Sequence, residues 1–349
     1  MQSFANAIVV LWGWRRLAVA CIAGAVSALA FAPFYAVPVL WLTVPVFVWL
    51  IDGAEPDDED PAWRRLLPAA SVGFAFRFGF FLAGLWWIGA AFLVDADMFA
   101  WALPFAVAGL PALLALFWAV AAAAARLFWR EGWSRILVFA VALSAAEWLR
   151  GHLFTGFPWN AFGYALTPAP VFMQAAALVG VWGLTLAAFI VFAVPVVLVG
   201  ESPPVRRRVI VAGAVLLVAH VGFGLVRLAA GPDPLVAGVH LRIVQPAIPQ
   251  DERWASEKSA ESMARYLELS RGGPSGQKDG LAGITHVIWP ESAFPFLLTR
   301  HPEALAAIAD LLPPGTTLIT GAARGERLPD GHQLVFNSIY AIDDGGEIR

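Results

Sequence analysis

One carboxylate near the C-terminus follows directly on an apolar, strand-like run. In "THVIWPESAFPF", residues 285–296, the β-branched segment ends at Trp289-Pro290 and Glu291 comes next. We expect the aromatic and proline neighbours to desolvate this acid, which would raise its pKa towards the range of a general base. A structural role is the alternative, because a carboxylate at a strand end can cap the following turn. The pattern alone leaves both interpretations open.

A general base needs a nucleophile within reach and a donor that holds an oxyanion. The single cysteine, Cys21, lies among small apolar residues of the first hydrophobic run, where we expect a thiol to pack rather than react. The two lysines, Lys258 and Lys278, both precede Glu291. One cysteine also excludes an intramolecular disulfide and a multi-cysteine metal site, and we expect no metal and no cofactor.

The composition is that of a polytopic membrane protein. Hydrophobic residues make up 59% of the chain and charged residues 14%, and the mean hydropathy is +0.70. The net charge of −3 gives no argument for a nucleic-acid partner. Seven apolar runs predict a helical membrane domain over residues 1–231. These runs cover residues 16–32, 36–51, 69–94, 100–125, 135–150, 170–199 and 207–230.

The loops between these runs carry an asymmetric charge. Ten arginines lie on alternate loops of one side, and the short loops of the other side carry only Arg150. The ten are Arg15, Arg16, Arg64, Arg65, Arg126, Arg130, Arg135, Arg206, Arg207 and Arg208. This bias predicts that the arginine-rich side and the N-terminus are cytoplasmic. Seven spans would then place the chain after about residue 231 on the periplasmic face of a bacterial inner membrane.

Several polar residues lie inside the predicted spans or at their ends. Arg77 and His220 are costly in lipid, so we expect them to face protein or a cavity. Glu147 and Arg150 are three residues apart on a predicted helix, which favours an ion pair at the membrane interface. The loop that follows, residues 151–166, is rich in glycine and aromatic residues. It suits the bilayer interface, either as an anchor or as the rim of a lateral opening for lipid.

The composition changes sharply after residues 229–234, and α/β patterning begins. Strands are predicted at 240–245, 285–291, 316–323 and 334–343, and helices at 251–270 and 301–312. Strands that alternate with helices favour an α/β sheet. Ligands of such sheets gather beyond the carboxyl ends of the strands, which is where Glu291 is predicted to lie.

Several stretches, in the same order along the chain, resemble the apolipoprotein N-acyltransferases. "WPESAFP" is similar to the glutamate motif of the nitrilase superfamily in the form found in that family. "IVQPAIPQDERW" (243–254) resembles the opening strand and loop of its membrane-attached domain. Residues 147–166 and 174–186 resemble its membrane half.

This resemblance implies a bacterial inner-membrane enzyme with a nitrilase-like, α-β-β-α domain, of which residues 232–349 would be an incomplete N-terminal part. It implies transfer of an acyl chain from a phospholipid to the α-amine of the diacylglyceryl-cysteine of apolipoproteins, through a thioester. Glu291 matches the general base. Trp254 matches a tryptophan of the mobile loop over the active site; the alternative is a packed aromatic at a helix start. Asn337, in "FNSIY", is expected to support the site by a hydrogen bond.

The family's catalytic lysine comes after its glutamate, and neither lysine of this chain does. The last residues, "FNSIYAIDDGGEIR", predict a strand, a turn and the start of a return strand. We therefore expect a C-terminally truncated, inactive fragment without the lysine and cysteine of the triad, and with an open sheet edge. Two other functions remain: a membrane-tethered nitrilase-like amidase, or a non-catalytic lipid-binding protein. A monomer is the default expectation.

Overall fold

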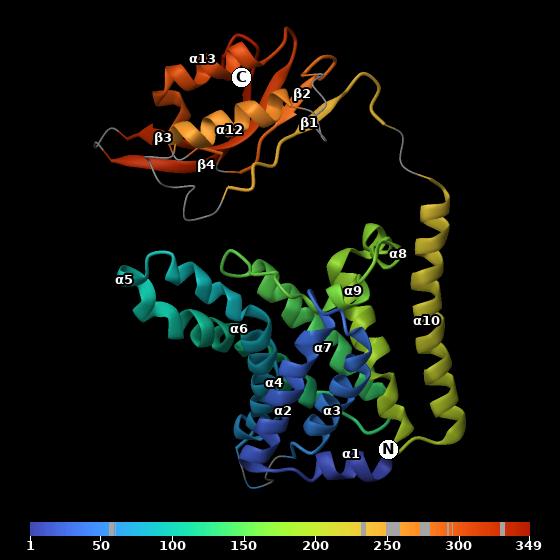
Figure 1. The fold of residues 1–349 in the computed structure, drawn as a ribbon. Helices are drawn as coiled ribbons and strands as arrows, with labels where there is room; N and C mark the ends of the chain where they lie inside the picture. The colour runs from blue at the N-terminus through green and yellow to red at the C-terminus, as the bar shows by residue number, and fades with distance from the viewer. Residues whose placement is uncertain are drawn as a thin grey trace. The chain divides into compact units, whose positions relative to one another are not determined.

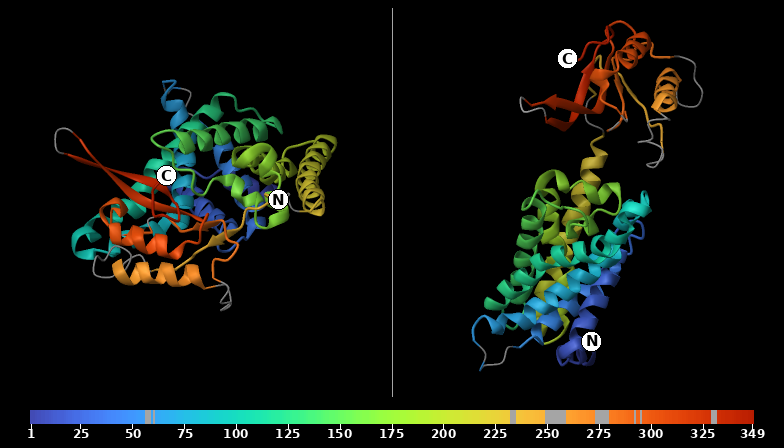
Figure 2. Two further views of the ribbon diagram at one scale, coloured as in Figure 1. Left: turned by 90° about the horizontal axis from the view of Figure 1, so that it is seen from above. Right: turned by 90° about the vertical axis from the view of Figure 1, so that its left-hand side faces the viewer.

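The chain consists of two compact units, Met1–Pro232 and Asp233–Arg349, the first helical and the second built on a sheet (Figures 1 and 2). The structure, a computed structural model, describes residues 1–55, 59, 61–231, 235–248, 259–272, 280–291, 293–294, 296–328 and 332–349.

Helices of very different length make up the first unit. The α-helices are α1 (Gln2–Val9), α2 (Gly13–Ser27), α3 (Leu40–Asp52), α4 (Leu67–Leu85), α5 (Ala96–Phe99), α6 (Leu110–Leu127), α7 (Ser134–His152), α8 (Pro170–Met173), α9 (Ala176–Ala193) and α10 (Pro203–Ala229). Short 3-10 segments extend several of them, among them η7 (Phe162–Leu166) and η8 (Val194–Leu198). The expected span 170–199 is thereby divided into α8, α9 and η8, and α9 itself is kinked at Gly180.

Within the described residues, five helical runs are long and apolar enough to cross a membrane. They are Gly13–Ala30, Arg64–Leu93, Ala96–Leu127, Ala176–Leu198 and Pro203–Ala229, and they overlap the first, third, fourth, sixth and seventh expected spans. The second expected span is the shorter apolar helix Val37–Asp52. The fifth is α7, which carries Arg135, Glu147 and Arg150 and is therefore less apolar along its sequence. The chain is thus a multi-pass membrane protein with five candidate spans, and the seven-span arrangement stays a prediction.

Close helix packing and stacked aromatic rings hold the helical unit together. Phe47 stacks on Phe76 with 4.3 Å between ring centroids, and Trp118 stacks on the same pair. Between α2 and α4, Gly24 lies so close to Phe76 that a Cβ at this position would be 1.8 Å from the Phe76 carbonyl oxygen. Small residues at helix contacts are typical of membrane proteins, because backbones can approach and gain dispersion energy there.

The second unit contains a four-stranded mixed sheet in the order β1-β2-β3-β4. Its strands are β1 (Leu241–Ile243), β2 (His286–Ile288), β3 (Thr317–Arg327) and β4 (Gln333–Ile342), with helices α12 (Ser259–Arg271) and α13 (Pro302–Leu311). The first three strands are parallel, and β4 pairs antiparallel with β3. The predicted α/β alternation is therefore confirmed, while the expected helical residues 251–258 lie outside the described part of the chain.

The two faces of this sheet are covered unequally. Val287 and Leu318 are fully buried in a core that also contains Tyr266 of α12 and Ile308 of α13. The alternate residues on the outer strands point the other way, as the period of two requires. Among them, Leu241, Ile243 and Ile339 are 54%, 73% and 79% exposed. Among the described residues, this face of the sheet thus leaves apolar side chains of the outer strands exposed.

The predicted turn after β4 is confirmed. The Asp343 carboxylate accepts hydrogen bonds from the backbone N–H groups of Gly345 and Glu347, at 3.0 and 2.9 Å. The chain then turns back, and Ile348 forms an antiparallel bridge with Ile342. The hydrogen bond from the Glu347 amide holds the pKa of Asp343 below its usual range, with a smaller contribution from Arg349.

Candidate functional site

Glu291 follows the carboxyl end of β2, and the backbone around it is held by β3. Trp289 donates its backbone N–H to the Ile319 carbonyl at 2.9 Å, and Ala293 donates to the Gly321 carbonyl at 3.1 Å. These bonds continue the pairing with β3 past the end of β2, and they fix the backbone on both sides of Glu291. The position at the mouth of a parallel strand, expected from the sequence, is therefore confirmed.

The carboxylate itself is exposed to solvent, so the expectation that its neighbours desolvate it is wrong. The reason is the direction of those neighbours. The Trp289 indole points into the core, where it is 2% exposed and donates to the Ser270 hydroxyl of α12 at 2.9 Å. Phe294 is also buried, 3% exposed, and packs against Trp289. Because the rings that flank Glu291 in sequence fill the core, they leave its side chain on the outside.

Asn337 is the partner that the fold brings to Glu291. It lies on β4 opposite Ala323 of β3, and its side-chain Nδ2 donates to Glu291 Oε1 at 2.6 Å. The two residues are 46 positions apart, and β3 lies between their strands. An amide donor on one carboxylate oxygen restricts the rotation of the side chain.

Of the remaining sequence candidates, Trp254, Lys258 and Lys278 lie outside the described residues. Cys21 is in α2 of the helical unit, half-buried, and lines an apolar groove with Phe74 and Phe78 of α4.

A second polar cluster lies inside the helical unit, where Glu147 of α7 binds two arginines. Its Oε1 is 2.6 Å from Nη2 of Arg77 on α4, and its Oε2 is 2.8 Å from Nη2 of Arg150. The Trp118 indole N–H of α6 donates to the same Oε1 at 2.7 Å. All three charged side chains are fully buried. The predicted pair of Glu147 and Arg150 is therefore confirmed, but it is a buried three-membered cluster and not an interfacial pair.

Sequence reasoning did not join Arg77 to this cluster, although a signal was present. Glu147 is the only carboxylate inside the seven expected spans, and Arg77 lies in the middle of another span. A charge buried in a membrane domain is tolerated when it is paired. A single carboxylate and a cation that needs a partner therefore predict an ion pair between Glu147 and Arg77. The guanidinium of Arg77 also lies 4.1 to 4.4 Å from the ring centroids of Phe81, Phe80 and Trp118. These cation–π contacts help to replace its lost hydration.

The cluster also fixes the aromatic loop after α7. Arg150 donates hydrogen bonds from Nη1 to the carbonyl oxygens of Phe157 and Trp159, the latter at 3.1 Å. Arg77 donates to the Asn160 carbonyl at 3.2 Å. The buried ions thus bind backbone groups of a loop that would otherwise have no regular hydrogen bonding. His220 is held in a similar way, with its Nε2 3.0 Å from the Leu166 carbonyl oxygen, so both in-span polar residues face protein as expected.

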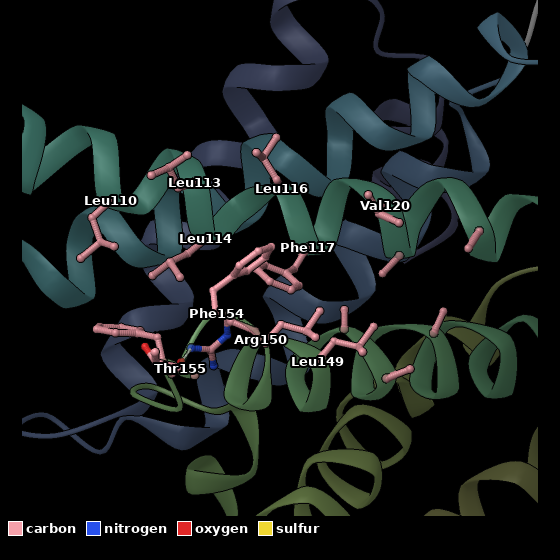
Figure 3. A pocket seen from close by; sticks show the side chains of 18 residues that line it. Leu110, Leu113, Leu114, Leu116, Phe117, Val120, Leu149, Arg150, Phe154 and Thr155 are labelled. Carbon is pink, nitrogen blue, oxygen red and sulfur yellow. Dashed lines mark hydrogen bonds between the residues drawn. The ribbon is translucent and has the colours of Figure 1, made fainter.

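An apolar groove of about 800 Å³ lies between α6 and α7 and ends at this loop (Figure 3). Leu110, Leu113 and Phe117 project into it from α6. Arg150 and Thr155 lie at the end where the chain leaves α7 (Figure 3). The loop residue Phe154, also part of the lining, is 90% exposed. The loop thus lines one end of an apolar groove, while its role as an anchor or as the rim of a lipid opening stays a prediction.

Known proteins are similar to this chain along its whole length. The family model described as the apolipoprotein N-acyltransferase N-terminal domain matches residues 23–194. A protein of Rhodopseudomonas palustris called apolipoprotein N-acyltransferase is 50% identical over 353 residues, which cover 100% of this chain and 65% of the relative. Relatives of the same name from Bradyrhizobium diazoefficiens and Rhizobium meliloti are 48% and 44% identical, with the same coverage. Along its whole length the chain is similar to the apolipoprotein N-acyltransferases.

The match to the apolipoprotein N-acyltransferases includes both candidate clusters. Arg77, Glu147 and Arg150 lie within the part that the N-terminal domain model covers. Glu291 and Asn337 lie beyond that part, in the region aligned with the whole-length relatives. The chain spans about 65% of the length of these relatives.

Proposed function

We propose that this protein is an apolipoprotein N-acyltransferase. It moves an acyl chain from a membrane phospholipid to the α-amine of the N-terminal diacylglyceryl-cysteine of apolipoproteins, through a thioester acyl-enzyme. The observation that carries the proposal is the hydrogen bond of 2.6 Å between Asn337 and Glu291 at the carboxyl end of β2. The names of the relatives and the apolar helices support the same function.

Glu291 acts as the general base in this proposal. Within the described part of the chain its Oε2 accepts no hydrogen bond, so this oxygen can take the proton of a thiol while Asn337 holds Oε1. The thiolate then attacks the phospholipid ester carbonyl, and Glu291 returns the proton to the departing lysophospholipid, which leaves a thioester. Glu291 next takes a proton from the α-amine of the apolipoprotein as this amine attacks the thioester, and returns it to the thiolate that is expelled. We assign Trp254 to a loop over this site and exclude Cys21 as the nucleophile, because Cys21 packs among apolar side chains of α2 and α4.

The exposed sheet face supports the proposed domain assignment. Residues 1–231 form the transmembrane domain, and residues 232–349 form part of a nitrilase-like domain. In an α-β-β-α sandwich, helices cover one face of each sheet and a second sheet covers the other. Helices α12 and α13 cover one face here, and Leu241, Ile243 and Ile339 leave the opposite face apolar and exposed.

The arginine asymmetry supports an inner-membrane protein with a cytoplasmic N-terminus and a periplasmic α/β domain. The groove between α6 and α7 is open and almost wholly apolar, with Thr155 and Arg150 at one end, and so fits an acyl chain that enters from the bilayer. We further propose that the protein works as a monomer.

Substitution of Glu291 by Gln in the intact natural protein tests the general base. The change keeps the shape and the hydrogen bond to Asn337 but removes the proton acceptor. Formation of the thioester from radiolabelled phospholipid should fall at least about 100-fold. Glu326→Gln is the matched control, because Glu326 is an exposed carboxylate of β3 whose side chain is 53% accessible.

Undiminished thioester formation in the Glu291→Gln protein would contradict the base role. The other two functions have distinct outcomes in the same assay. A membrane-tethered amidase would release the acyl group to water without passing it to an amine. A non-catalytic lipid-binding protein would bind phospholipid and show no turnover.

A further inference from the structure

Helix α10 is held to the rest of the helical unit at only a few points. It lies at the edge of that unit in two perpendicular views (Figures 1 and 2). Only 17% of its most apolar 18-residue stretch is buried, which is the lowest share among the five candidate spans. Its buried residues are Gly213, His220 and Gly224. Gly213 lies directly against the side chain of Val194, and His220 binds the Leu166 carbonyl. These three residues share one face of α10. Beside this face, cavities remain between α10 and α9.

That space is a crevice along α9 and α10, which α7 also lines at one end. It consists of two adjoining cavities of about 450 and 470 Å³, which share Ile190 of α9 and Leu216 of α10 as lining residues. Along α10 the lining extends from Val205 to Phe223. At the rise of an α-helix this is a length of about 27 Å, close to the roughly 30 Å of a bilayer's hydrocarbon core. The crevice is therefore long enough for an acyl chain from either leaflet.

Positive charge gathers at one end of the α9–α10 crevice. Arg208 is part of its lining, and Arg206 and Arg207 precede it in the first turns of α10. Within the described residues none of the three forms an ion pair. Residues 201–208 contain these three arginines and one acid, Glu201, so the segment has a net charge of +2. Trp133, which also lines this end, is a residue type that favours the membrane interface.

We propose that the α9–α10 crevice is a binding site for an anionic phospholipid, separate from the acyl-transfer site. The phosphate lies against Arg206, Arg207 and Arg208, and one acyl chain enters the crevice from the Val205 end. Basic residues at the mouth of a pocket between membrane helices attract anionic headgroups, and the start of a helix adds a partial positive charge. The acyl chain fills apolar space along α9 and α10 and links α10 to the bundle.

The apolar surface of α10 on both sides favours a lipid over other occupants of the crevice. Outward residues of α10 such as Val215 and Val226 are 61% and 72% exposed, so the helix is apolar on its free side as well. A helix of this kind is surrounded by lipid. The opening between α9 and α10 is therefore filled from the bilayer, and Arg206, Arg207 and Arg208 select the headgroup.

The test measures lipid binding to the intact natural protein without turnover, so its outcome does not depend on the acyl-transfer proposal. The delipidated protein is titrated in detergent with phosphatidylglycerol or phosphatidylcholine of identical acyl chains, and bound lipid is counted by native mass spectrometry. We expect a site that prefers phosphatidylglycerol and that inorganic phosphate does not compete for.

Replacement of Arg206 and Arg208 by Gln should weaken phosphatidylglycerol binding at this site about 30-fold, from the usual contribution of two basic residues near a membrane surface. The matched control is the double change Arg15→Gln and Arg130→Gln, which removes two exposed arginines that do not line the crevice. This control should change the affinity less than about twofold.

A second pair of variants tests the crevice itself. Ala212→Trp places a large ring in the lining and should lower lipid occupancy at least fivefold, whereas Val215→Trp on the outward face of α10 should not. Equal affinity for the two lipids, or equal losses in a variant and its control, would overturn the proposal. Competition by inorganic phosphate would reduce the site to an anion site and would overturn it as well.

Discussion

Removal of the Glu147 carboxylate provides the most demanding test of the helical unit. Glu147→Gln keeps the size and the planar shape of the side chain but leaves Arg77 and Arg150 without a counter-ion. The cluster of one acid and two bases has a net charge of +1 in the wild type, and it would have +2 in the variant. All three side chains are fully buried, so water cannot replace the lost charge without opening the bundle.

The expected cost follows from the behaviour of buried ion pairs. Loss of one partner of a buried pair destabilises a protein by about 3–5 kcal/mol, because the other charge remains desolvated. Here one carboxylate serves two cations, at 2.6 and 2.8 Å, so we expect a value near the upper end of that range, about 5 kcal/mol. The amide of Gln can still accept from the Trp118 indole, and this retained hydrogen bond keeps the packing between α6 and α7.

The free energy of unfolding can be measured in micelles by steric trapping, with Glu131→Gln as the control. Glu131 is exposed in the loop before α7, so its loss should change stability by less than about 0.5 kcal/mol. Arg77→Met combined with Glu147→Gln leaves a single cation and should be more stable than Glu147→Gln alone. A cost of less than about 1 kcal/mol for Glu147→Gln, or no rescue in the double variant, would refute this account of the cluster.

The remaining predictions concern single contacts. Asn337→Ala should slow thioester formation about tenfold in the labelled-phospholipid assay, because a hydrogen bond to a charged group is lost. The circular dichroism spectrum should stay unchanged. An unchanged rate would show that Asn337 does not contribute to acyl transfer. Gly24→Leu should abolish a monodisperse peak on size exclusion, whereas Gly222→Leu should not, because a Cβ added at Gly222 would meet no atom within 4 Å. The folded pKa of Asp343 is lowered, so its stabilisation of the C-terminal turn is present above the unfolded pKa of about 3.9 and is lost as the pH falls through the lower folded pKa. Hydrogen exchange at the Glu347 amide should accelerate across that window in the wild type, and Asp343→Ala should exchange fast at every pH.

Local patterns in the sequence were sufficient for most elements of the fold. Apolar runs predict membrane helices because hydrophobicity is summed over neighbouring residues, and five of them are helices of the required length and composition. The strand that ends at Ile288 and the turn after Ile342 were also predicted, since strand and turn preferences are local as well. The fifth expected span, α7, is not among these five helices because it carries three charged residues, of which Glu147 and Arg150 are buried in the structure.

What the sequence by itself determined is where most of the helices and strands form, and that Glu291 lies at the end of a strand. Only the tertiary structure decided that Asn337 donates to Glu291, that Glu291 is exposed, and that Arg77 shares one carboxylate with Arg150. Each of these features depends on residues far apart in the chain, or on the direction in which a neighbour points. Hydropathy and turn preference act over a few residues, whereas a hydrogen bond across a sheet and an ion pair between two helices exist only after the whole unit has packed.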